Sequence, residues 1–127
     1  MGLITPGVLQ AATTVVKTAE TDIGEEVSCG HYDTITIFLD YVKGDETGVY
    51  VIPYALLETG GDEYQWQTWS ATAGDKTSTS SRALMTATGK YYITFDVRGI
   101  RFIKFKHQAS GGTPTGTLAA NYTLTAI

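Results

Sequence analysis

The chain has 127 residues, which suits a single domain, and its eight Tyr, four Phe and two Trp supply enough apolar area for one core. A net charge of -4 argues against binding of duplex nucleic acid, because such a protein needs a basic face to displace counterions from phosphates. Charged residues make up 17% of the chain, below the usual quarter. We therefore expect a neutral surface, which suits contact with other protein subunits or with sugars.

Cys29 is the only cysteine, so the chain can form no disulfide within itself. A small domain without disulfides fits assembly in a reducing cytoplasm. The first residues lack the basic start and the apolar stretch of a signal peptide, and no apolar run reaches transmembrane length. We expect a protein that neither crosses nor binds a membrane.

Residues 1–12 contain Pro6 and Gly7 and show no clear hydrophobic period, which predicts an extended arm ahead of a single β-sandwich domain over residues 13–127. Leu3, Ile4 and Pro6 are the candidate residues for contact between this arm and a neighbouring subunit. The first strands of the domain are predicted at 13–18 and 26–32.

Two alternating runs between Thr34 and Leu57 flank the tight loop Gly44–Gly48 and predict a β-hairpin. The first run places four apolar residues on one face (Ile35, Ile37, Leu39 and Tyr41). Phe38 is the one bulky residue on the opposite face. The second run is apolar on both faces, which predicts a central strand, and Pro53 within it requires a bulge or an edge position.

Further strands are predicted at 63–70, 82–88 and 116–127, and a second hairpin over 91–97 and 100–108, whereas residues 71–81 have the composition of a mobile loop. Short strands at this spacing, with no helical period, predict an all-β fold. We expect a two-sheet antiparallel β-sandwich of eight or nine strands with jelly-roll-like order. An immunoglobulin-like sandwich is the alternative.

The sequence contains no pattern of a catalytic or metal site. Cys29 and His31 could share a strand face, but no local motif supports a nucleophile and base there. The acidic pairs, including Asp45 and Glu46, are interpreted as turn chemistry and solubility, and Lys104 and Lys106 as the solvated side of a strand. We expect no enzyme activity, no cofactor and no bound metal.

Aromatic residues are the remaining candidates for ligand binding. Trp66 and Trp69, with nearby Asp62 and Glu63, could hold a sugar if an indole were exposed. The chain would then be a carbohydrate-binding module or lectin-like domain. Core or subunit-interface packing is the more ordinary role for aromatic residues on the strands of a small sandwich.

The stretch from Thr34 to Val49, which reads TITIFLDYVKGDETGV, resembles a recurring segment in small virion proteins of tailed bacteriophages and prophages. The segment from Arg98 to Lys104, RGIRFIK, also resembles a stretch in those proteins. The resemblance covers residues 34–57 and 90–108 and carries over no active-site residues.

This resemblance implies a non-enzymatic structural protein of a phage particle, such as a capsid decoration protein or another head, neck or tail component. The protein would be made in the host cytoplasm and would dock on a protein shell through repeated contacts with capsid or tail subunits. A homo-oligomer is expected, with a trimer favoured. Sugar binding belongs to the alternative.

Overall fold

The computed structural model describes residues 3–10, 15–72 and 75–126, and the side chains among them apart from those of residues 3 and 68–80. Over this part of the chain every regular element is a β-strand. The strands are β1 (Leu3–Gln10), β2 (Thr21–Ser28), β3 (Thr34–Val42), β4 (Val49–Leu56), β5 (Glu63–Gln65), β6 (Gln67–Thr72), β7 (Asp75–Ser80), β8 (Ala83–Met85), β9 (Gly89–Asp96), β10 (Phe102–Ala109) and β11 (Thr117–Ala126).

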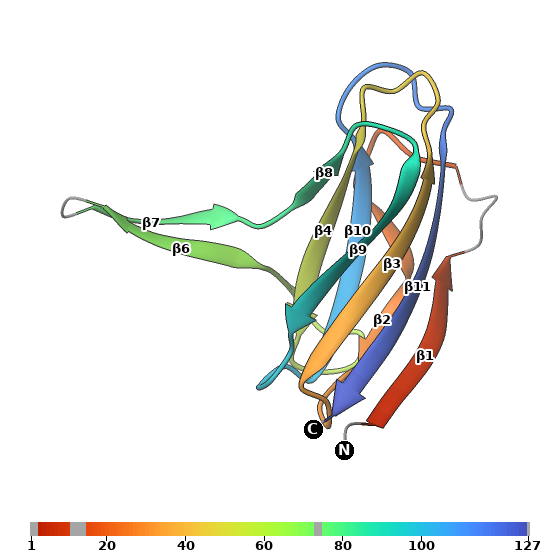
Figure 1. Cartoon of the computed structure of the whole chain (residues 1–127). Helices are drawn as coiled ribbons and strands as arrows, with labels where there is room; N and C mark the ends of the chain where they lie inside the picture. The colour runs from red at the N-terminus through yellow and green to blue at the C-terminus, as the bar shows by residue number, and fades with distance from the viewer. Residues whose placement is uncertain (1–2, 11–14, 73–74, 127) are drawn as a thin grey trace.

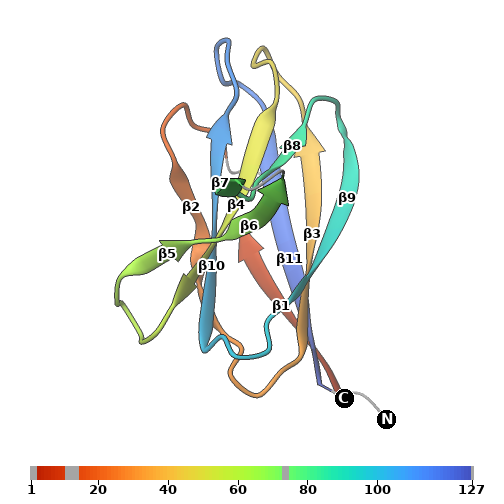
Figure 2. The ribbon, with the colours of Figure 1, turned by 90° about the vertical axis from the view of Figure 1, so that its left-hand side faces the viewer.

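Nine of these strands form two antiparallel sheets that pack face to face (Figures 1 and 2). Sheet A has the order β1-β11-β3-β9, and sheet B has the order β2-β10-β4-β5, with β8 also paired to β4. With β8 taken as the fourth strand of sheet B, each sheet has four strands, and the chain changes sheet at every connection except that between β4 and β8. This is the jelly-roll order. The predicted β-sandwich of eight or nine strands is confirmed, and the strand order favours the jelly roll over the immunoglobulin-like alternative.

The two predicted hairpins are not hairpins. Strand β3 pairs with β11 and β9, whereas β4 pairs with β10, β5 and β8, so the loop between β3 and β4 crosses from one sheet to the other. Strands β9 and β10 likewise lie in different sheets. Alternation of apolar residues indicates which face of a strand is buried. The alternation is the same whether the next strand in the chain lies in the same sheet or in the opposite one, so it does not distinguish a hairpin from a crossing.

The N-terminal segment also differs from the expected arm. Over Leu3–Gln10 it forms β1, an edge strand of sheet A that runs antiparallel to β11 from the pair Leu3 and Ala126 onward. The chain then continues to β2, at Thr21–Ser28, in place of the strands predicted at 13–18 and 26–32. The weak alternation of β2, in which only Ile23 and Val27 are buried, explains why its position was hard to predict.

Strand β4 is central, as its two apolar faces predict, and both Val51 on the inner face and Ile52 on the outer face are buried. Pro53 lies in the middle of this strand. On the side away from β10, β8 pairs with residues 49–51 and β5 with residues 54–56, so Pro53 falls where one partner strand ends and the next has not begun. The missing N–H of proline therefore interrupts no ladder.

Between β5 and β8 the chain leaves the sandwich as a two-stranded ribbon made of β6 and β7 (Figure 1). The ribbon includes described residues of the segment 71–81, for which a mobile loop was predicted. Its base is attached to the body by hydrogen bonds from Trp66 N–H to the Pro53 carbonyl, 3.1 Å, and from Ser81 N–H to the Trp66 carbonyl, 2.8 Å. An isolated two-stranded ribbon is only marginally stable in water.

The core lies between the sheets and contains the predicted inward residues Ile35, Ile37, Leu39 and Tyr41, all of them buried. Ile103 and Phe105 from sheet B face them and are fully buried. Burial of each such side chain stabilises the fold by about 1.5 to 3 kcal/mol relative to its exposure.

A buried carboxylate links two of the loops that cross between the sheets. Glu46, in the β3–β4 loop, accepts hydrogen bonds from the hydroxyl of Tyr41, from Gly44 N–H at 2.9 Å, and from Thr115 and Gly116 N–H in the β10–β11 loop at 3.0 and 2.9 Å. Burial alone would raise the pKa of Glu46, but these donors outweigh it and lower the pKa to about 2. Glu46 is fully buried and is not the solubilising turn residue that the sequence predicted.

Glycine is required at Gly116, because a Cβ there would lie 2.3 Å from the Glu46 carboxylate and 2.5 Å from the Val42 carbonyl oxygen. The turn at Gly112 has a left-handed φ of 75°, which also favours glycine. The β3–β4 and β10–β11 loops therefore both pack against the Glu46 carboxylate.

Replacement of Glu46 by Gln should lower the free energy of unfolding by about 3 kcal/mol at pH 7. Each carboxylate oxygen accepts two hydrogen bonds, so the amide NH₂ of Gln would face two donors whichever way it turns. Because the pKa is lowered in the folded state, this stability is present above pH 4.5 and is lost as the pH falls toward 2. Urea unfolding at pH 7 and pH 3 would measure both effects.

The control is Glu25→Gln, at an exposed position of β2, which should change the free energy of unfolding by less than about 0.5 kcal/mol. Equal losses in the two variants would contradict the role assigned to Glu46.

Candidate assembly surface

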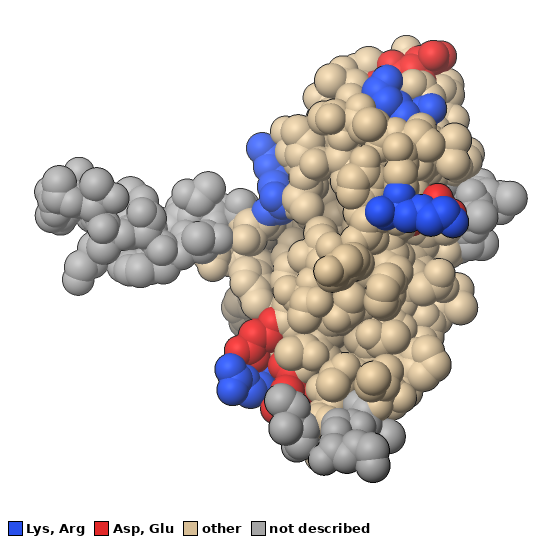
Figure 3. Space-filling model, viewed as in Figure 1, with Lys and Arg blue, Asp and Glu red and all other residues tan. Residues whose placement is uncertain are grey.

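The outer face of sheet A is mostly uncharged. Strands β1 and β11 contain no charged residue. Among the described residues that point outward from this sheet, only Asp40, Lys90 and Asp96 are charged. Figure 3, which looks onto this side, shows a broad area without charged side chains. We call outer face A the set Ile4, Pro6, Val8, Thr34, Thr36, Phe38, Asp40, Lys90, Tyr92, Thr94, Asp96, Ala119, Asn121, Thr123 and Thr125.

A row of side chains crosses all four strands of this face. Val8 is paired with Asn121, Asn121 with Phe38, and Phe38 with Tyr92. The exposed fraction is 76% for Val8, 43% for Phe38 and 72% for Tyr92, and Ile4 on β1 is 64% exposed. Single exposed apolar residues are ordinary, but a mostly uncharged face that gathers several exposed apolar side chains around one polar residue, Asn121, is a candidate site of interaction.

The side chains of this face are ordered by contacts between strands β3 and β9. The rings of Phe38 and Tyr92 lie 6.2 Å apart between centroids and are tilted by 36°. The hydroxyls of Thr36 and Thr94 are hydrogen-bonded at 2.8 Å. Asp40 and Lys90 form an ion pair at 3.5 Å. These fixed side chains lose less conformational freedom when another molecule covers them.

Two shallow depressions flank the centre of this face. One, of about 270 Å³, is lined by Phe38, Asp40, Lys90, Tyr92 and Asn121 together with Leu39 and Tyr91. The other, of about 370 Å³, lies on the β1 side and is lined by Pro6, Gly7, Val8, Phe38, Asn121, Tyr122 and Thr123. Phe38 and Asn121 line both depressions, so the Phe38 ring projects between them.

The candidate interaction residues of the N-terminal segment lie at one border of this surface. Ile4 and Pro6 are exposed on edge strand β1 and belong to outer face A. Leu3 begins the same strand, but its side chain lies outside the described part of the molecule. The sequence therefore indicated a region that the fold places next to Phe38, Asn121 and Thr123.

The two tryptophans proposed for sugar binding lie elsewhere. Trp66 is half-buried between β5 and β6, and its ring packs on Phe95 with centroids 5.6 Å apart. Phe95 in turn contacts the core residue Phe105 at 5.5 Å. Trp69 lies in β6, and its side chain is outside the described residues. Trp66 therefore packs against the core of the sandwich while staying partly exposed, and sugar binding by the two tryptophans remains a prediction.

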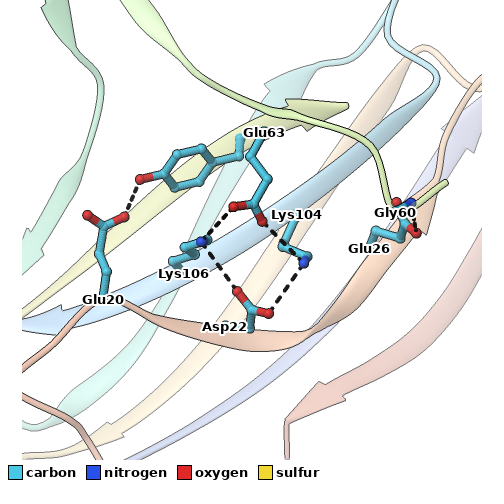
Figure 4. A network of polar contacts seen from close by, with 8 residues as sticks. Glu20, Asp22, Glu26, Gly60, Glu63, Lys104 and Lys106 are labelled. Carbon is cyan, nitrogen blue, oxygen red and sulfur yellow. Dashed lines mark hydrogen bonds and ion pairs between the residues drawn. The ribbon is translucent and has the colours of Figure 1, made fainter. Parts of the chain in front are cut away.

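The outer face of sheet B is strongly charged, in contrast to sheet A. Lys104 and Lys106 on β10 both contact Asp22 on β2, at 3.3 and 3.7 Å, and Glu63 on β5, at 3.2 and 2.8 Å (Figure 4). The hydrogen bond from Lys106 lowers the pKa of Glu63 below its ordinary 4.5. Because each lysine is neutralised by two carboxylates, this cluster is a poor site for phosphate and ties three strands together.

The residues considered for catalysis do not meet. Cys29 is fully buried, with Sγ 3.4 Å from the carbonyl oxygen of Ile100, and burial raises the pKa of its thiol to about 11, whereas His31 is exposed. His107 is fully buried, and its Nε2 accepts a hydrogen bond from the Lys17 N–H at 3.2 Å.

Within the described residues, no group of three His, Cys, Asp or Glu residues is arranged to hold a metal ion. That part of the chain also has no helix able to span a membrane.

Comparison with known proteins finds the same fold in viral and prophage proteins. The SPBc2 prophage-derived protein YomS is similar with a TM-score of 0.62 at 20% identity, over 99% of this chain and 96% of that one. The VP2 subviral particle of infectious bursal disease virus has a TM-score of 0.56 at 10% identity, over 98% of this chain and 33% of that one. A structure of the Gx strain of that virus gives 0.54 at 10% identity and 32% of its chain.

The likeness to YomS extends over nearly the whole of both proteins, whereas this chain spans about a third of the two virus chains. No protein-family model matches the sequence, and no curated protein matches it. At these identities the comparisons establish a shared β-sandwich fold.

The free energy of unfolding should fall as the pH is lowered from 7 to 5.5, because of His107. Burial, with a smaller effect from the charge of Lys17, lowers its pKa below the ordinary 6.5. The unfolded chain therefore takes up a proton first, and stability is lost below pH 6.5, by about 1 kcal/mol per pH unit. His107→Phe should remove this slope, whatever its own stability at pH 7.

The matched control is His31→Gln, at an exposed position, which should retain the slope of the unaltered protein. Denaturant unfolding of all three proteins at pH 7.5, 6.5 and 5.5 makes the comparison. A slope that survives in His107→Phe would mean that another group is responsible.

Proposed function

We propose that this chain is a structural protein of a phage particle, a capsid decoration protein or another head, neck or tail component. The observation that carries the proposal is the jelly-roll fold over the whole described chain, shared with a prophage-derived protein over 96% of its length and with part of a virus VP2 protein. Those proteins belong to a prophage and to a virus particle.

Outer face A supports a role in assembly. Subunits that repeat on a particle need a surface that can be removed from water without leaving charges unpaired, and the uncharged row from Val8 to Tyr92 is such a surface. Repetition then turns modest single contacts into strong attachment. The partners proposed are other virion proteins and further copies of this chain. The trimer favoured by the sequence remains a prediction, and the two-fold contact argued below is an alternative to it.

The ribbon formed by β6 and β7 is a second feature that fits assembly. It projects from the side of the sandwich, and its strands pair only with each other (Figures 1 and 2). Because a free two-stranded ribbon is marginally stable, it gains from contact with a neighbouring subunit.

A carbohydrate-binding module is the second candidate, on an observation different from the one the sequence offered. The depression beside Tyr92 combines an exposed aromatic ring with Asp40, Lys90 and Asn121. Aromatic rings stack on sugars, and such polar groups can fix sugar hydroxyls. The β1 part of outer face A, at Ile4, Pro6 and Val8, offers no side-chain hydrogen-bonding group, which favours a protein partner.

A proteomic measurement tests the structural role. Particles released by the strain that carries the gene would be purified on a density gradient and analysed by quantitative mass spectrometry. We expect peptides of this chain to sediment with the particles in multiple copies per particle, because a structural subunit repeats on its shell. Its presence only in particle-free fractions would contradict the proposal.

The carbohydrate alternative makes its own prediction. If it holds, soluble glycans should bind the purified protein, and Tyr92→Ala should abolish binding while Tyr64→Ala, at another exposed tyrosine on sheet B, should not. We expect no glycan-dependent change in tyrosine fluorescence or in calorimetric titration.

A further inference from the structure

We propose that outer face A is the contact surface for a second copy of this chain, with the two copies related by a two-fold axis. The proposal rests on the structural role above and specifies one of its repeated contacts. A single surface that meets the same surface of another copy does so with two-fold symmetry.

The distribution of charge favours a second copy as the occupant. The chain carries a net charge of -4, so two copies repel each other overall. On outer face A, however, Asp40 is paired with Lys90, and Asp96 is paired with Arg98 at 2.6 Å. The middle of the face is uncharged, so two copies can meet there without opposing like charges. An acidic or basic partner would find the charges of this face already paired with one another.

The area of the face is adequate for a stable dimer. Four strands spaced by about 4.8 Å, each of eight to ten residues that rise about 3.4 Å, cover roughly 600 Å² in projection. Accessible area exceeds projected area on a surface with projecting side chains. A standard interface buries about 800 Å² on each partner, so this face has the size required.

The shape of the face also suits contact with itself. The rings of Phe38 and Tyr92 project beside a depression of about 270 Å³, and a second depression of about 370 Å³ lies on the β1 side of Phe38. In a two-fold contact the projecting rings of each copy can enter a hollow of the other. Aromatic residues in such pockets are the usual centres of binding energy.

Pairing through the free edge of β1 is less suitable than packing on the face. Edge strands invite pairing with another chain through their unpaired N–H and C=O groups. Pro6 lies in the middle of β1 and has no N–H to donate, and the pairing register shifts between Val8 and Gln10. Both features interrupt the regular row of groups that an added strand would need.

The test is sedimentation velocity of the full chain over a wide concentration range, with charge placed at two distant points of the face. We expect the unaltered protein to reach a dimer. Tyr92→Glu on β9 and Val8→Glu on β1 should each raise the dimer dissociation constant by about tenfold or more, because each would bury a carboxylate against apolar groups. Both side chains are largely exposed, so the fold should tolerate the changes.

Leu84→Glu is the matched control. It places the same charge on an exposed apolar residue of β8 in sheet B, and it should leave the dimer unchanged. Circular dichroism and urea unfolding would verify that all variants are folded. The proposal would be overturned by a protein that stays monomeric at the highest concentration, by a trimer, by a dimer that both face variants leave intact, or by equal dissociation in Leu84→Glu.

Failure of this inference is distinguishable from failure of the proposed function. A chain that is found in particles but is monomeric in solution would refute the two-fold contact and leave the structural role in place. A dimer that depends on Tyr92, formed by a chain absent from particles, would do the reverse. Binding of a glycan that Tyr92→Glu abolishes, by a chain that is monomeric and absent from particles, would refute both and assign the face to sugar.

Discussion

The fold depends on a chain that changes sheet at nearly every connection. From β1 to β4, and again from β8 to β11, each strand is followed by one in the opposite sheet, so the inner faces of neighbouring segments pack against each other across the core. The loops that cross must span the thickness of two packed sheets, about 10 Å. At the end of the molecule that contains the β3–β4 and β10–β11 loops, the carboxylate of Glu46 joins two such crossings through four hydrogen bonds.

The two outer faces of the sandwich differ in charge and in what covers them. Sheet B carries β5, β8 and the ribbon, and its lysines are neutralised by Asp22 and Glu63, so this side is occupied by contacts within the chain. Sheet A has no such cover over its described residues, and its strands β1 and β11 lack charge entirely. The apolar, preordered surface therefore lies on the side of the molecule that β5, β8 and the ribbon leave open, which fits the proposed role in assembly.

Much of the fold could be predicted from alternation of apolar residues. The inward residues of β3, the central position of β4 and the strand character of β9, β10 and β11 follow from side-chain period alone. The choice of neighbouring strand does not follow, because the short loop at residues 43–48 after β3 has the same composition whether it closes a hairpin or crosses between sheets. The ribbon was missed because the composition of residues 71–81 is that of a loop, and β1 because its apolar residues show no regular period.

The candidate surface was indicated by one residue whose meaning needed the fold. Phe38 stands on the polar face of its strand, and this was visible in the sequence, but its partners Tyr92, Asn121 and Val8 come from three other strands. Only the strand order brings them into one row. The tryptophans drew attention in the sequence because they are large, yet Trp66 packs on Phe95 within the sandwich. The role of Glu46 was equally hidden, since a carboxylate in a Gly-rich loop resembles any polar turn residue.

The central claim is that outer face A is covered when the protein assembles. Hydroxyl-radical footprinting of the protein, free at low concentration and assembled in particles, tests this most directly, because it measures the solvent accessibility of two tyrosines in the same chain. Tyr92 on outer face A and Tyr64 on sheet B are 72% and 54% exposed, so both should be labelled in the free protein. The account predicts that assembly reduces labelling of Tyr92 several-fold and leaves that of Tyr64 nearly unchanged. Equal labelling of Tyr92 in the two states would contradict the assignment of this face to assembly.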